Sequence, residues 1–80
     1  MFYMRNIIGR HVRKARLSQT PKLTQRELAA RLQILGMPVD RAGISKIEND
    51  IRTVTDIEVL IMAKALGVSA AWLLGEDSNK

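Results

Sequence analysis

A run of residues near the middle of the chain combines hydrogen-bond donors with small side chains at helical spacing. Ile44 and Ile47 recur three residues apart and supply the buried side of a short helix. The residues that remain point outward, and two of them are positively charged donors without an acceptor, which suits a phosphate or the acceptor atoms of a base. This outward set comprises Arg41, Ala42, Ser45 and Lys46.

These residues belong to the second of two predicted helices, which cover residues 24–35 and 41–49 and are joined by a turn. Thr24 is the N-cap of the first, and Glu27 completes a capping box three residues later. Asp40 is the expected N-cap of the second. The free backbone amides at the start of residues 24–35 form an anion site next to Gln25.

Three more helices are predicted around this pair, over residues 5–17, 56–66 and 70–74. Leucine, isoleucine and alanine recur at helical rather than alternating spacing, and aromatic residues make up 4% of the chain, so we expect an all-α fold with an aliphatic core. Residues 1–80 are short enough for one domain. We expect residues 1–4 to be frayed or to lie on a partner, and the end of the chain to form a disordered tail.

Several details of packing are also expected from the sequence. The helix at 56–66 is apolar on most sides, which is typical of a central core helix. Leu35 extends the inner face of the helix before it. Gly43 costs about 1 kcal/mol in helix propensity relative to alanine, so we expect a packing reason for it, such as close approach to the preceding helix. Trp72 and its neighbours either close the core or face a second subunit.

The charge distribution is uneven along the chain. The net charge is +5, and residues 1–52 hold eleven Lys and Arg against four Asp and Glu, whereas residues 53–80 hold two against four. A basic N-terminal part suits a polyanion on one face, although a solvated basic surface is equally compatible with charge alone.

Other classes of protein fit the sequence poorly. There is no cysteine, which excludes disulfides and thiolate zinc sites and favours a cytoplasmic protein. The longest apolar stretch is far below the roughly 20 residues that cross a bilayer, so we expect no membrane association. His11 has no second metal ligand and no matched acid or nucleophile beside it. We therefore expect neither an enzyme nor a cofactor or metal.

Three segments of the chain at matching separations point to a family. LTQRELAARL, ISKIEND and IMAKALGVSAAWLLG resemble the phage-repressor-like helix-turn-helix family, the lambda-repressor and xenobiotic-response-element type of regulator. The similarity runs from about residue 8 to residue 75. Its most specific parts are the patterns TQxxLA, IxxIEN and AxxLGV.

The resemblance implies a compact five-helix domain whose third helix lies in the major groove of DNA. Carried over by position, Gln25 contacts a backbone phosphate, and the outward residues Arg41, Ala42, Ser45 and Lys46 face base edges. Arg41 then reaches guanine O6 and N7, Lys46 takes guanine or phosphate, and Ala42 contacts a thymine methyl group. Glu48 pairs with an arginine of the first helix, which in this sequence is Arg16. Further backbone contacts are implied for Lys22, Asn49, Arg52 and Thr53.

Two features depart from the family pattern. The turn at residues 33–39 is longer than the usual three or four residues, so we expect the second helix to run one turn longer and the third to lie at a shifted angle. Asp50 replaces the glycine often found after Glu-Asn, and we expect it to cap or to hydrogen-bond locally.

The leading hypothesis is a sequence-specific DNA-binding transcriptional regulator, a repressor, that binds double-stranded DNA as a homodimer on two half-sites about one helical turn apart. The alternative is a protein-interaction module, or the antitoxin of a toxin-antitoxin pair, that uses the same fold for a protein partner. The long turn and Asp50 favour the alternative.

Overall fold

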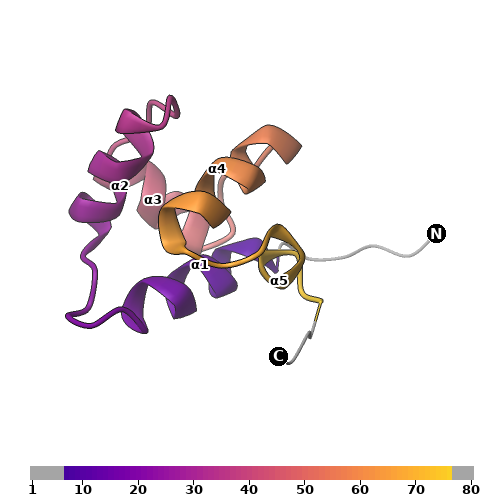
Figure 1. Cartoon of the computed structure of the whole chain (residues 1–80). Coiled ribbons are helices and arrows are strands. Elements are labelled where there is room, and N and C mark those ends of the chain that lie inside the picture. The colour runs from indigo at the N-terminus through magenta and orange to yellow at the C-terminus, as the bar shows by residue number, and fades with distance from the viewer. Residues whose placement is uncertain (1–6, 77–80) are drawn as a thin grey trace.

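The computed structural model describes residues 7–76, and within that range it contains five helices and no strand (Figure 1). The helices are α1 (Ile8–Leu17), α2 (Gln25–Ile34), α3 (Arg41–Glu48), α4 (Asp56–Leu66) and α5 (Ala70–Leu73). The predicted all-α fold is confirmed. The expectations for residues 1–4, for a helix start at residue 5 and for the end of the chain fall wholly or partly outside the described residues.

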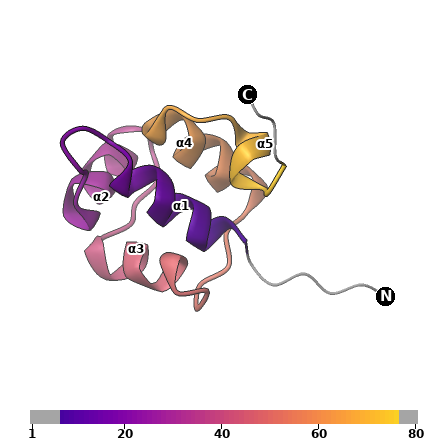
Figure 2. The ribbon, with the colours of Figure 1, turned by 90° about the horizontal axis from the view of Figure 1, so that it is seen from below.

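The first four helices form a four-cornered bundle. Helices α1 and α2 each pack against both α3 and α4, so α3 and α4 occupy opposite corners. Figure 2 shows α3 along one edge of the molecule and α4 along the other, with α1 between them. The short helix α5 closes one end by packing on α1 and α4.

The core lies between these helices and is aliphatic, as the composition predicts. Burying one leucine or isoleucine contributes about 1.5–3 kcal/mol, so side chains of this kind supply most of the driving force. The largest fully buried side chains are Val12, Leu28, Leu32, Met37, Ile44, Ile47, Met62 and Leu73.

Local capping sets where the helices begin. Thr24 Oγ1 accepts from the Glu27 amide at 3.0 Å, and the Glu27 carboxylate accepts from the Thr24 amide at 2.8 Å. Thr55 and Glu58 form the same capping box at the start of α4. Asp40 caps α3 by accepting from the Gly43 amide at 2.8 Å. The predicted N-caps Thr24 and Asp40 are therefore present.

The end of α2 agrees with the predicted range of residues 24–35 to within one residue. The helix stops at Ile34 and its C-cap is Leu35, because Gly36 adopts a left-handed conformation with φ +96°. The Met37 amide then donates to the Leu32 carbonyl at 2.8 Å and the Gly36 amide to that of Gln33 at 3.1 Å, which is a Schellman motif. Leu35 follows the helix and is 39% exposed, so its predicted place on the inner face is wrong.

The long turn that follows is packed onto the bundle. Met37 and Val39 are buried in the core, and Gln33 Nε2 donates to the Val39 carbonyl at 2.9 Å. A Cβ at Gly43 would collide with Val39 Cγ2. The sequence suggested a close approach of α2 as the packing reason for Gly43. The structure shows instead that the long turn, through Val39, leaves no room for a side chain there.

Helix α4 is less central than its composition predicts. Val59, Met62 and Leu66 are buried, but Ile57 and Leu60 are 64% and 60% exposed. The helix occupies a corner of the bundle, and one of its faces is covered by no other helix within residues 7–76. In α5, Leu73 closes the core while Leu74 is exposed.

Candidate nucleic-acid interface

The outward face of α3 carries the four residues that the sequence singled out. Ile44 and Ile47 are fully buried, whereas Arg41, Ala42 and Lys46 are exposed and Ser45 is half-buried. At 100° per residue, Arg41 lies at one edge of the outward face and Lys46 at the other. The charged donors therefore flank a strip made of Ala42 and Ser45.

A buried ion pair fixes the C-terminal end of α3. Arg16 Nε donates to Glu48 Oε2 at 2.7 Å and Arg16 Nη2 to Glu48 Oε1 at 3.0 Å. Arg16 Nη1 also donates to the Leu23 carbonyl at 3.0 Å, so every part of the guanidinium is used. Gly9 permits this approach, because a Cβ there would collide with the Ile47 carbonyl oxygen. The two residues that the resemblance pairs are in contact.

Gln25 joins the same carboxylate from α2. Its Nε2 donates to Glu48 Oε1 at 3.0 Å, and the side chain is half-buried. An amide nitrogen carries two hydrogens, so one is left to donate outward. Gln25 is therefore held in a defined orientation at the N-terminus of α2, where backbone amides already favour an anion.

A hollow opens beside this N-terminus, and we call it the first hollow. It is lined by Arg16, Thr24, Gln25, Arg26 and Arg41. Arg26 and Arg41 are both exposed, so two free guanidinium groups meet the positive end of α2 here. Arg26 was missed in the sequence, although its place directly after Gln25 in the first turn of α2 was a usable signal.

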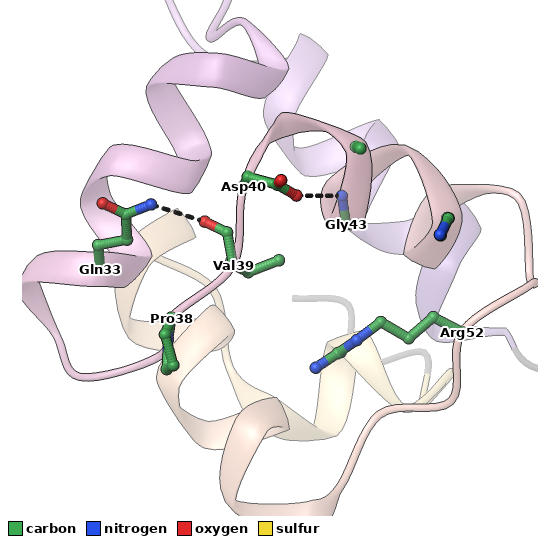
Figure 3. Close-up of a pocket in the computed structure, with 8 residues that line it drawn as sticks. Gln33, Pro38, Val39, Asp40, Gly43 and Arg52 are labelled. Atoms are coloured by element: carbon green, nitrogen blue, oxygen red, sulfur yellow. Dashed lines mark hydrogen bonds between the residues drawn. The ribbon is translucent and has the colours of Figure 1, made fainter.

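The second hollow lies on the other side of α3, between the long turn and the loop after α3 (Figure 3). The Arg52 side chain extends into this space, facing Pro38 and Val39 across it. Lys46 supplies a second positive charge. The lining residues are Gln33, Pro38, Val39, Asp40, Ala42, Gly43, Lys46 and Arg52.

Arg52 has an intramolecular partner in the second hollow. Its Nη2 donates to Glu58 Oε2 at 3.0 Å and its Nη1 to Glu58 Oε1 at 3.3 Å. The hydrogen bond from Arg52 lowers the pKa of the Glu58 carboxyl below its usual value. The Arg52 guanidinium is therefore already paired within the chain.

The other residues expected to contact the DNA backbone do not gather in one of the two hollows. Lys22 and Thr53 are exposed, and neither lines the two hollows. Asn49 Nδ2 donates to the Ser45 carbonyl at 2.8 Å and so helps to close α3. Asp50 adopts φ +61°, which explains why glycine suits this position, and its amide donates to the Ile47 carbonyl at 3.1 Å.

The comparison with protein families agrees with this arrangement. A family model described as helix-turn-helix matches residues 12–73. The chain belongs to the phage-repressor-like helix-turn-helix family. It is therefore a DNA-binding transcriptional regulator, in a family that is generally not enzymatic. No curated protein and no solved structure matches the chain.

Two further observations concern the described part of the chain. No helix within residues 7–76 is long and apolar enough to cross a membrane. Across the same residues, His, Asp and Glu do not gather into a group that could hold a metal ion.

Proposed function

We propose that residues 1–80 form a single DNA-binding domain that recognises a specific sequence, with α3 in the major groove, and that the protein acts as a repressor. The observation that carries this proposal is the position of the two hollows. One lies at each edge of the outward face of α3. Arg26 and Arg41 line the first hollow, and Lys46 and Arg52 line the second. A helix in the major groove has a phosphate backbone on either side, and the hollows match that arrangement.

In this proposal, the two hollows position the protein and α3 reads the sequence. Gln25 and Arg26, with the amides of α2, hold one strand, while Arg52 holds the other. Lys22, Asn49 and Thr53 add contacts to the sugar-phosphate backbone of the DNA. Such contacts dominate the salt-dependent affinity but carry little sequence preference.

Base reading falls to the outward residues of α3. Arg41 donates two hydrogen bonds to guanine O6 and N7, Lys46 donates to guanine or phosphate, and Ala42 contacts a thymine methyl group. Ser45 donates to or accepts from a base edge between them. Each matched bidentate contact discriminates against the wrong base by about 1–3 kcal/mol.

We further propose that the regulator binds its operator as a homodimer on two half-sites about one helical turn apart, and that it works in the cytoplasm without a cofactor. Repression then follows from occupying the operator. The described residues present one α3, so a second copy doubles the contacts with DNA.

The test is selection of bound duplexes from a random pool, at moderate salt, with purified protein. The proposal predicts enrichment of a short sequence that recurs as an inverted repeat with centres about 10 base pairs apart. A pool that stays random after repeated selection, while the protein still binds duplex DNA, would refute sequence recognition. A partner protein captured equally well after nuclease digestion, with no DNA bound, would favour the interaction-module alternative.

A further inference from the structure

Helix α1 carries a cluster of positive charges that faces solvent. Seven Lys and Arg precede Glu27, which is the first acidic residue of the chain. Three of them are exposed on α1, namely Arg10, Arg13 and Lys14, and we call these residues the basic face of α1. Within residues 7–76, no carboxylate forms an ion pair with any of the three. The basic face is therefore available to a negatively charged partner.

Contacts on two sides fix how α1 is turned about its axis. Gly9 and Arg16 lie against α3, since a Cβ at Gly9 would collide with the α3 backbone and Arg16 pairs with Glu48. His11 lies against α5, where its ring stacks on that of Trp72 with 4.8 Å between the ring centroids. The basic face occupies the exposed arc of α1 between these two sides.

The three cations lie at different angles from α3 around this arc. At 100° per residue, Arg13 is about 60° from Arg16 around the helix axis. Arg10 is about 120° from Arg16, and Lys14 is about 160° from it. Arg13 is therefore next to α3, Arg10 follows, and Lys14 is next to the side that packs on α5.

Helix α1 lies along the edge of α3 that carries Arg41. Arg41 and Glu48 are about two turns apart, so both lie on the same side of α3. Arg16 binds Glu48 and also lines the first hollow together with Arg41. The basic face therefore begins beside the first hollow and continues from it along α1.

We propose that Arg13 and Arg10 bind phosphates of the same DNA strand that the first hollow holds, so that α1 lengthens the contact with the DNA backbone. The inference rests on the proposed placement of α3 in the major groove. Along the axis of α1, Arg13 and Arg10 lie about 4.5 Å and about 9 Å from Arg16. Phosphates of one strand advance about 3.4 Å per base along the duplex, so the two side chains take phosphates within about three of the first hollow.

The continuity with the first hollow favours DNA over an acidic protein segment as the partner of this face. Arg26 and Arg41 line that hollow, and a strand bound there carries further phosphates past it. Arginine also suits a phosphate, because its planar guanidinium donates two parallel hydrogen bonds to the phosphate oxygens.

The first test compares three single variants of α1 on a duplex of mixed sequence. Arg13→Gln and Arg10→Gln are each expected to lower affinity by about two- to fivefold. Each should also reduce the slope of log affinity against log salt by about 1. Lys14→Gln is the matched control, because it removes the same charge from the same helix on the side of α5, and it should change the slope little. Equal slopes for all three variants would overturn the proposal.

Glutamine keeps a helix propensity close to that of arginine and lysine, so α1 should still form in each variant. Thermal unfolding checks that the fold is kept.

The second test assigns individual phosphates on the selected duplex, by replacing one phosphate at a time with an uncharged methylphosphonate. A phosphate that Arg13 binds should matter to the wild type and not to Arg13→Gln. Arg26→Gln assigns a phosphate of the first hollow in the same way. We expect the two phosphates on one strand, within about three of each other. A phosphate assigned to Arg13 on the other strand, or none at all, would contradict the proposed path of the DNA.

The two tests separate this inference from the proposed function. If no duplex is selected from the random pool, sequence recognition fails, while the first test still decides the role of α1 on mixed-sequence DNA. If a duplex is selected and Arg41→Ala weakens its binding, but Arg13→Gln and Lys14→Gln behave alike, only the contact through α1 is refuted.

Discussion

Gln25 and Arg16 bind the same buried carboxylate, that of Glu48. Gln25 Nε2 lies 3.0 Å from Glu48 Oε1, and Arg16 Nε lies 2.7 Å from Glu48 Oε2. Three helices therefore meet at one side chain, because Arg16 belongs to α1, Gln25 to α2 and Glu48 to α3. The N-terminus of α2, where a phosphate is proposed to bind, is in this way fixed relative to the helix proposed to read bases.

Removing the carboxylate should destabilise the fold. Glu48→Leu leaves the Arg16 guanidinium buried without its ion-pair partner, so we expect the free energy of unfolding to fall by about 3 kcal/mol. Urea denaturation measures the change. The matched control is Arg16→Met with Glu48→Leu, which removes both charges and should recover most of the loss. A double variant as unstable as Glu48→Leu would contradict the role of the pair.

Arg26 should contribute to affinity for any duplex. Arg26→Ala is expected to weaken binding to all sequences similarly and to reduce the slope of log affinity against log salt by about 1, because one phosphate contact is lost. Arg31→Ala is the control, since Arg31 is on the same helix but donates to the Ala65 carbonyl at 3.1 Å, away from the first hollow. If the two variants showed the same slope of log affinity against log salt, Arg26 would not contact a phosphate.

Gly9 should be intolerant of a methyl group. In Gly9→Ala, the added Cβ collides with the Ile47 carbonyl oxygen, so α1 must move away from α3. We expect a loss of about 1–3 kcal/mol in unfolding free energy, despite the better helix propensity of alanine. Thermal denaturation tests this. Gly43→Ala is the comparison, because there the added Cβ collides with the Val39 side chain and not with the backbone. A stability gain in Gly9→Ala would show that the two helices are not in close contact.

Glu58 should contribute to both acid stability and DNA affinity. Its carboxyl pKa is lowered by Arg52 in the folded state, so the stabilisation is complete above the unfolded pKa and is lost as pH falls through the folded pKa. Glu58→Gln keeps a capping group at this position but loses the charge. Unfolding free energy measured from neutral pH into the acid range should therefore fall less steeply for Glu58→Gln than for wild type.

The same substitution releases Arg52 for phosphate. We expect Glu58→Gln to raise affinity for all duplexes by about two- to fivefold, because a partly exposed ion pair of this kind contributes about 0.2–1 kcal/mol. The control is Glu58→Gln in the Arg52→Ala background, where the gain should be much smaller. An equal gain in both backgrounds would mean that Glu58 acts by general charge and not through Arg52.

The sequence predicted features that depend on neighbouring residues better than those that depend on distant ones. The capping residues Thr24 and Asp40 were identified because a cap and its partner are three residues apart. The helix predicted over residues 24–35 ends within one residue of the observed end of α2, where Gly36 adopts a left-handed conformation.

Features that arise from tertiary packing were harder to predict from the sequence. Helix α4 is apolar on most sides, so periodicity alone did not show that Ile57 and Leu60 face outward. The hydrogen bonds from Gln25 to Glu48 and from Arg52 to Glu58 join residues whose proximity depends on the path of the chain. The family pattern supplied Arg16 with Glu48, but it did not supply Arg26 or the second hollow.

The central claim is that α3 reads bases while the hollows on either side of it hold phosphates. It is tested most directly by titrating wild type, Arg41→Ala and Arg52→Ala with the selected duplex and with a scrambled duplex of the same composition. We predict that Arg41→Ala loses about 1–3 kcal/mol on the selected duplex and little on the scrambled one, whereas Arg52→Ala loses similar amounts on both. Equal losses on both duplexes for both variants would contradict the account.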